Sequence, residues 1–177
     1  AKVVAIDAKG MVTPLGNGEA TITATHGGGL KATVKVAVKG FDGVQPINFG
    51  NEIVPIFTKA GCNGGGCHGK SGGQNGFRLS LLGFEPQEDY EYLLREARGR
   101  RIFPAAPERS LLLLKATGQL PHGGGSRIAA DSFDYRMLVK WIRQGMPYGK
   151  PNDPKLDSIT VHPVERIMKP SARQQLV

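Results

Sequence analysis

Residues 60–69 read AGCNGGGCHG and contain both cysteines of the 177-residue chain. Cys62 and Cys67 are separated by four residues, His68 follows directly, and five of the ten residues are glycine. Two thiols and an adjoining imidazole in this order suit a small number of chemistries. The choice among them largely decides both the fold and the function expected for the chain.

Three chemistries explain part of this stretch. A disulfide between Cys62 and Cys67 would staple a short loop in an exported protein, but it leaves His68 without a role. Zinc is a second possibility, although a structural zinc site normally has four ligands and the other histidines form no companion pair at ligand spacing. A dithiol redox centre is a third, although its thiols are usually two residues apart. These alternatives stay open.

Covalent haem attachment accounts for all three residues in this order. Each thiol bonds to one vinyl group of the porphyrin, and the histidine after the second thiol binds the iron. Two residues usually separate the thiols, whereas here there are four. Glycine reaches backbone conformations closed to other residues, so the two extra residues can bulge outward. The sequence therefore predicts one haem c, bound through Cys62 and Cys67, with His68 as an iron ligand.

Helical patterns occupy most of the chain after residue 48. In residues 51–61 an apolar stripe precedes Gly61, which is predicted to end the helix. In residues 131–145 Asp131 is the predicted N-cap and Gly145 the predicted stop. Further helices are expected within 85–99 and 107–118. The predicted apolar stripes consist of Ile53, Ile56 and Phe57 in the first helix, and of Phe133, Met137, Leu138, Trp141 and Ile142 in the last.

The two ends of the chain have the two-residue alternation of β-strands. EATITATH (19–26) and KATVKVAVK (31–39) place apolar residues on one face and polar residues on the other. Three or four short strands are expected here, too few to close a sandwich alone. Weaker alternation follows residue 150. The expected fold class is α+β with several domains: β segments at 1–40 and 151–177 around a mainly helical unit at 41–150.

The chain carries 23 Lys and Arg against 15 Asp and Glu, a net charge of +8. This excess is spread along the sequence, whereas a nucleic-acid binder usually concentrates it on one face. No apolar run approaches the roughly 20 residues of a membrane span. Neither a nucleic-acid partner nor a membrane span is therefore expected.

Residues 47–150, about 60% of the chain, resemble the cytochrome c domains of large planctomycete-type exported proteins. The resemblance lies in PIFTKAGCNGGGCHGKSGGQNGFRLSLLGFEPQEDY (55–90), GRRIFPAAPERSLLLLKATGQLPHGGGSRI (99–128) and YRMLVKWIRQGMP (135–147). In that family such domains lie between immunoglobulin-like domains of the bacterial group 2 type. Residues 10–38 look like later strands of one such domain and 156–177 like opening strands of another, so both flanking modules are partial.

The resemblance implies a second iron ligand in the loop before the last helix. That loop, GQLPHGGGSRIAAD (118–131), has no methionine, and His122 is its only strong donor. Met146 beyond the helix and Met137 within it are weaker candidates. The expected metal ligands are thus His68 and His122. The expected haem contacts also include the apolar wall residues Phe77, Leu79 and Trp141, and Arg101 as the first-ranked partner of the propionates, ahead of Arg78 and Arg127.

With both axial positions filled, electron transfer is favoured over catalysis at iron. The expected partner is a redox protein or another haem, and covalent attachment implies the bacterial periplasm or the cell exterior. One alternative is an assembly module whose terminal β strands pair between copies and complete a sandwich, forming a homo-oligomer with the haem as conduit. Another is an enzyme with an open haem, such as a peroxidase, which would require His122 not to bind the iron.

Overall fold

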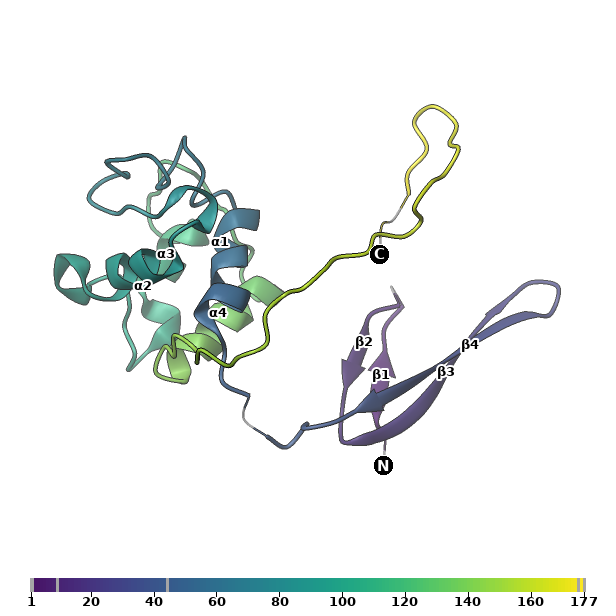
Figure 1. Ribbon diagram of the computed structural model, residues 1–177. Helices are drawn as coiled ribbons and strands as arrows, with labels where there is room; N and C mark the ends of the chain where they lie inside the picture. The colour runs from purple at the N-terminus through teal and green to yellow at the C-terminus, as the bar shows by residue number, and fades with distance from the viewer. Residues whose placement is uncertain (1, 9, 44, 175, 177) are drawn as a thin grey trace. The chain divides into compact units, whose positions relative to one another are not determined.

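The computed structural model describes residues 2–8, 10–43, 45–174 and 176. It divides the chain into two compact units, Ala1–Pro46 and Ile47–Val177. Among the described residues, the first unit holds four strands and the second holds four α-helices; these elements are drawn in Figure 1. The chain is therefore α+β, with antiparallel strands first and helices after them. No helix in the described part of the chain is long and apolar enough to cross a membrane.

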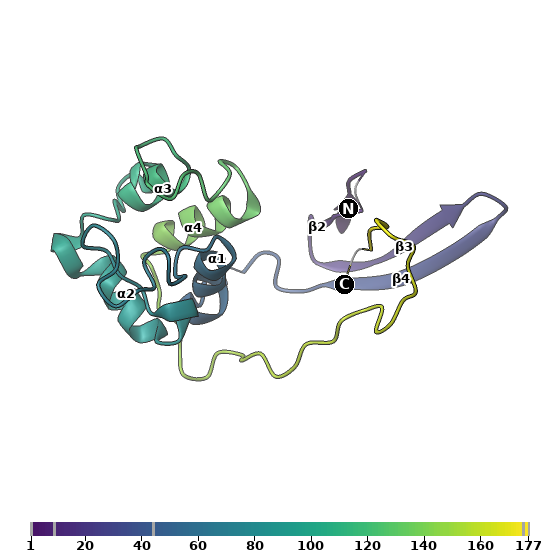
Figure 2. The same ribbon diagram turned by 90° about the horizontal axis from the view of Figure 1, so that it is seen from above.

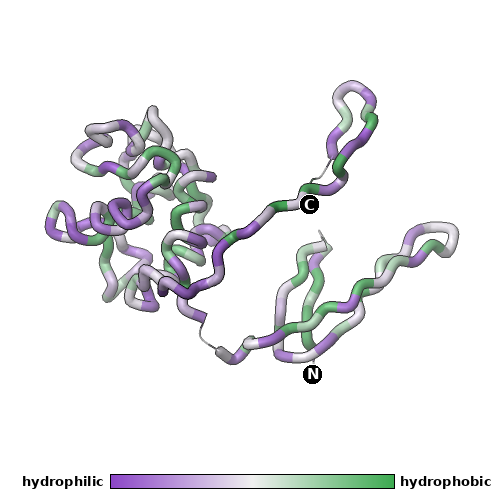
Figure 3. The backbone as a smooth tube through the Cα atoms, viewed as in Figure 1, coloured by the Kyte–Doolittle hydropathy of each residue, from purple (hydrophilic) through white to green (hydrophobic). Residues whose placement is uncertain are grey.

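The first unit consists of two antiparallel pairs. Strand β1 (Val4–Ile6) pairs with β2 (Val12–Pro14), and β3 (Gly18–His26) pairs with β4 (Leu30–Val38). The predicted strands at 19–26 and 31–39 are thus confirmed to within one residue. Apolar and polar residues alternate along this long hairpin (Figure 3). None of the described residues in this unit is fully buried, because two-stranded pairs have no second layer to cover them.

The second unit begins with a continuous helical segment, the π-helical turn Phe49–Ile53 followed by α1 (Val54–Lys59). Asn48 caps it: its side chain accepts from the Asn51 amide at 2.9 Å, and Glu52 accepts from the Asn48 amide at 2.7 Å. The other helices are α2 (Pro86–Leu94), α3 (Leu111–Ala116) and α4 (Phe133–Arg143). Short 3₁₀ turns lie at Leu81–Gly83, Glu96–Gly99 and Pro107–Arg109.

One hydrophobic core joins these helices, which gather around a common centre (Figure 2). The predicted stripe of α1 is buried, and in α4 Leu138, Trp141 and Ile142 are at most 1% exposed. Phe133, predicted as a member of the α4 stripe, is the first residue of the helix and is 66% exposed, so it does not belong to the buried stripe. Trp141 packs against Phe49, with ring centroids 5.4 Å apart.

The N-cap of α4 differs from the prediction. Ser132, in an extended conformation, is the cap, and its side chain accepts from the Tyr135 amide at 3.2 Å. Asp131 has φ +60° and lies one residue before the cap. Both residue types cap helices well, so composition could not choose between adjacent positions.

The C-terminal segment has no strand among its described residues 151–174 and 176. The opening strands expected at 151–177 are therefore not seen in the described part of that range. A strand needs a neighbour for its amides and carbonyls, and the pairings described join only β1 with β2 and β3 with β4. Its first residues are held at the helical unit, where Asn48 donates to Asp153 at 2.9 Å and Asn51 donates to the Pro154 carbonyl at 2.6 Å.

Candidate functional site

The end of α1 fixes the position of Cys62. Gly61, with φ +73°, ends the helix as predicted, and its amide donates to Thr58 at 3.0 Å. The Cys62 amide reaches back to the Phe57 carbonyl at 2.8 Å. These two bonds form a Schellman motif, which requires a left-handed residue at Gly61. The first thiol is therefore attached directly to a helix terminus.

The loop between the thiols is closed by its own backbone. The His68 amide donates to the Cys62 carbonyl at 2.9 Å, and the Gly69 amide donates to Gly64 at 3.1 Å. A Cβ on Gly69 would lie 2.0 Å from the Asn63 carbonyl oxygen, so this position admits only glycine. Of the four residues between the thiols, Asn63 is buried while Gly65 and Gly66 are exposed. Two of the four residues between the thiols are thus exposed.

His68 is oriented by the main chain. Its Nδ1 lies 2.9 Å from the Phe77 carbonyl oxygen. A carbonyl can only accept, so Nδ1 carries the proton and Nε2 keeps a free lone pair. Burial lowers the pKa of His68, against the opposing effect of the Phe77 hydrogen bond. The ring is therefore held neutral, which is the form that binds a metal.

His122 is oriented in the same way. Its Nδ1 lies 2.8 Å from the Gly125 carbonyl oxygen, which leaves its Nε2 free as well. The His68 and His122 ring centroids are 6.3 Å apart, and the two ring planes differ by only 9°. Two residues separated by more than fifty positions in the sequence thus form a matched pair of imidazoles.

A cavity of about 790 Å³ includes both histidines and both cysteines in its lining. Phe77 and Leu79, which the sequence predicts as wall residues, are part of the lining too. Sequence reasoning missed other apolar residues, and no signal in the chain marks them because they look like ordinary core. These are Phe57, Leu111, Leu112, Ala116 and Pro121. The volume lies within the usual range for small-molecule and cofactor sites, roughly 300–1,000 Å³.

The charges around the cavity have one sign. Its lining contains Arg100, Arg101, Lys115 and Arg127, and no carboxylate is among the described residues that line it. Lys115 donates to the Pro121 carbonyl at 2.8 Å. Among the described residues, neither Arg100 nor Arg127 has a partner for a side-chain hydrogen bond or an ion pair. Both are exposed and available to an anionic group.

Two predicted contacts differ in character from the rest. Arg101 lines the cavity but is only 4% exposed, and its guanidinium donates to main-chain carbonyls. Trp141 is not part of the cavity lining in the described chain, and its indole N–H donates to the Pro147 carbonyl at 2.9 Å within the aromatic core. Arg78, Met137 and Met146 also lie outside the lining.

Both thiols are free and partly buried. Burial, followed by the neighbouring Cys67, raises the pKa of Cys62, and Arg127 partly offsets this effect. The Cys62 thiol is therefore kept protonated. Among the described residues, no group of three or more His, Cys, Asp or Glu side chains is placed to hold a metal ion.

Comparison of the chain with models of protein families, with curated proteins and with solved structures found no match. Any assignment of function therefore depends on the residues around the cavity.

Proposed function

We propose that this chain binds one haem c through Cys62 and Cys67 and transfers electrons by outer-sphere exchange, with His68 and His122 as the axial ligands. The observation that carries the proposal is the imidazole pair. Two nearly parallel rings face one cavity, and each has its Nδ1 on a carbonyl and its Nε2 free. Two metal–nitrogen bonds of about 2 Å each, with half a ring on either side, span a centroid separation of this size.

The rest of the cavity also fits a porphyrin. Both thiols lie in the same lining as His68, as two thioether bonds to one ring require. Apolar side chains suit the faces of a flat macrocycle, and cations without competing carboxylates suit its acidic groups. Arg127 and Arg100 are the unpaired cations best suited to these groups, and Arg101, ranked first by sequence, has most of its donors engaged elsewhere.

When bound, the haem would supply a one-electron couple between ferrous and ferric iron. The chain contributes the residues that would bind the haem and tune its redox potential. The thiols of Cys62 and Cys67 would hold the ring and the imidazoles of His68 and His122 would bind its iron, which would leave no open position there for a substrate. The carbonyls of Phe77 and Gly125 fix the tautomer of each ligand. A pair of imidazoles favours ferric iron more than an imidazole and a thioether do, so a comparatively low potential is expected.

This function places the chain in a wider setting. The helical unit would be a class I-like cytochrome c domain, and the β segments would belong to immunoglobulin-like modules. Covalent haem attachment supports an exported location, in the periplasm or outside the cell. The expected partner is a redox protein or another haem, and the chain is not expected to be an enzyme.

Mass and colour test the proposal directly. The full chain would be produced in a periplasm equipped for covalent haem attachment, alongside the Cys62→Ala, Cys67→Ala double variant. We expect one added haem mass, and a haem spectrum that survives denaturation, in the parent chain only. A colourless parent chain with the mass of its amino acids alone would exclude the haem function.

A second candidate function is assembly through the β segments. Apolar residues stay exposed on the hairpin, where Leu30 is 68% and Val34 is 56% exposed, and on the C-terminal segment, where Val164 is 86% exposed. Size-exclusion chromatography with and without residues 151–177 tests it. A concentration-dependent oligomer that needs this segment supports assembly, whereas a monomer in both cases excludes it.

A further inference from the structure

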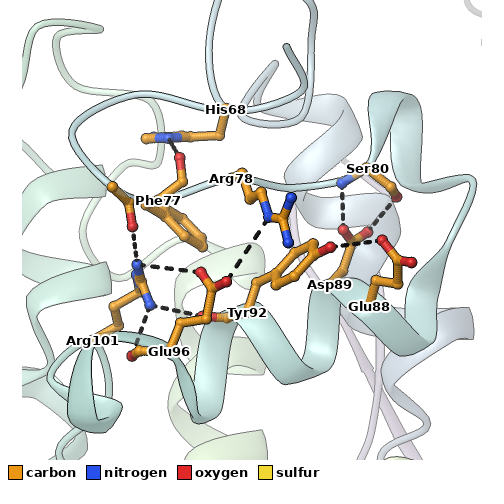
Figure 4. Close-up of polar contacts among 10 residues, drawn as sticks. His68, Phe77, Arg78, Ser80, Glu88, Asp89, Tyr92, Glu96 and Arg101 are labelled. Carbon is orange, nitrogen blue, oxygen red and sulfur yellow. Dashed lines mark hydrogen bonds and ion pairs between the residues drawn. The ribbon is translucent and has the colours of Figure 1, made fainter. Parts of the chain in front are cut away.

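Arg101 is an unusual arginine because it is 4% exposed, and arginine is almost never fully buried unless it is paired. Its Nη1 donates to the carbonyl oxygens of Tyr92 at 2.7 Å and Glu96 at 3.0 Å, and its Nη2 donates to the carbonyl of Gly76 (Figure 4). The Glu96 carboxylate is 4.0 Å away. Three of the five guanidinium N–H groups are therefore committed to the main chain.

These bonds act on the segment that holds His68. Gly76 directly precedes Phe77, whose carbonyl accepts from His68 Nδ1 at 2.9 Å. The Arg101 guanidinium lies 4.6 Å from the centre of the Phe77 ring. The Phe77 ring also contacts the His68 ring: their centroids are 4.6 Å apart, and the ring planes differ by 45°. Arg101 thus touches the residue that orients the imidazole through both the preceding carbonyl and the aromatic ring.

We propose that Arg101 is a positioning residue that sets the redox potential of the haem through Phe77 and His68, and does not bind the acidic edge of the ring. The proposal rests on the haem function proposed above. A hydrogen bond from a ligand histidine to a carbonyl raises the basicity of the ligand. A more basic imidazole stabilises ferric iron and lowers the potential. Holding the Phe77 carbonyl in place therefore keeps the potential low.

A simple charge effect would have the opposite sign. A buried positive charge beside the haem disfavours the ferric state, so its removal would lower the potential. Loss of positioning weakens the hydrogen bond of His68 and raises the potential. Lysine separates the two effects, because it keeps the charge but has no planar fork that can reach three carbonyls.

The experiment compares Arg101→Lys, Arg101→Met and the control Arg100→Met in the full haem-loaded chain. Arg100 is the adjacent arginine in the same cavity lining, but it is exposed. Haem attachment is first verified by mass, and then the midpoint potential and the ferric electron paramagnetic resonance (EPR) spectrum are measured. We expect Arg101→Lys to raise the potential by up to a tenfold change in the equilibrium constant, about 59 mV for one electron. Arg101→Met should raise it less, because the lost charge acts in the opposite direction. The EPR spectra of both Arg101 variants should also change, whereas Arg100→Met should lower the potential, because it removes only a positive charge beside the haem.

An unchanged potential in Arg101→Lys, together with a lower one in Arg101→Met, would overturn the proposal in favour of a charge effect. Equal shifts in Arg101→Met and Arg100→Met would overturn it in favour of contact with the acidic groups. If the Arg101 variants do not fold, Phe77→Leu decides, because it keeps the carbonyl but removes the ring that both neighbours contact. A raised potential supports positioning, and an unchanged one contradicts it. A parent chain without haem contradicts the proposed function instead.

Discussion

The imidazole planes of His68 and His122 differ by 9° across one cavity. If both rings bind one iron, ligand planes so nearly parallel should give a rhombic low-spin ferric EPR spectrum, since the d-orbital splitting depends on ligand orientation. We expect His122→Ala to become high spin and to bind cyanide readily, because one axial position opens. His26→Ala is the control, since His26 is exposed in β3. A low-spin spectrum that survives in His122→Ala would assign the sixth ligand elsewhere.

Gly69 and Gly66, on either side of Cys67 and His68, allow a matched comparison of two alanine substitutions. A Cβ on Gly69 would meet the Asn63 carbonyl at 2.0 Å, whereas a Cβ on Gly66 has no neighbour within 4 Å. Gly69→Ala should therefore destabilise the chain by about 1–3 kcal/mol, the usual cost of overpacking. It should also reduce the yield of haem-loaded protein. Thermal unfolding and haem content measure both effects, and equal behaviour of the two variants would disprove this account of the loop.

Asp89 gives the helical unit a pH dependence. It is 1% exposed and accepts from the Ser80 amide at 2.5 Å and from the Ser80 hydroxyl at 2.8 Å. Burial raises the pKa of Asp89 above its ordinary value of 3.8, despite these hydrogen bonds. The folded state therefore holds this proton at pH values where the unfolded chain has released it. This contribution to stability is fully present below the unfolded pKa and is lost as pH rises through the folded one.

We expect Asp89→Asn to remove that part of the pH dependence. Denaturant unfolding of the parent and the variant between pH 3.5 and neutrality, roughly the window in which a raised carboxyl titrates, provides the measurement. The difference in stability between the two should change across this range in favour of the variant as pH rises. A difference that stays constant with pH would show that Asp89 titrates alike in both states.

Substitutions at Trp141 and Leu79 distinguish the hydrophobic core from the wall of the cavity. Trp141→Phe leaves the Pro147 carbonyl without its indole donor, which should cost about 1–3 kcal/mol. Because Trp141 is not in the cavity lining, its replacement should leave the haem absorption bands unchanged. Leu79→Ala opens the lining itself and should alter both the bands and the potential. A shift of the bands in Trp141→Phe would restore Trp141 as part of the haem wall.

Sequence patterns located the helix ends that depend on glycine. Gly61 ends α1 as predicted, and Gly145, with φ +81°, ends α4. The two-residue alternation of the hairpin likewise predicted β3 and β4. Both signals are local, because each depends only on residues close together in the sequence. The cap at Ser132 and the missing strands after residue 150 could not be predicted this way, since the first involves two equivalent neighbours and the second needs a distant partner.

The residues of the candidate site likewise divide into those that the sequence predicted and those that it could not. Cys62, Cys67 and His68 lie close together in the sequence, and His122 is the one strong donor in its loop. The groups that orient the imidazoles are main-chain carbonyls of Phe77 and Gly125, and any residue type supplies a carbonyl. Sequence reasoning therefore had no signal for them. It also ranked Arg101 by its charge, whereas the structure commits that charge to carbonyls.

The Schellman motif at the end of α1 makes the first thiol sensitive to the length of the helix before it. One residue added to or removed from α1 would turn Cys62 by about 100° around the helix axis and move it about 1.5 Å along that axis. Extra residues beside Gly65 and Gly66 would instead extend an exposed loop. Changes in chain length are thus absorbed between the two thiols and are disruptive before the first of them, which tells an engineer where an insertion can be made.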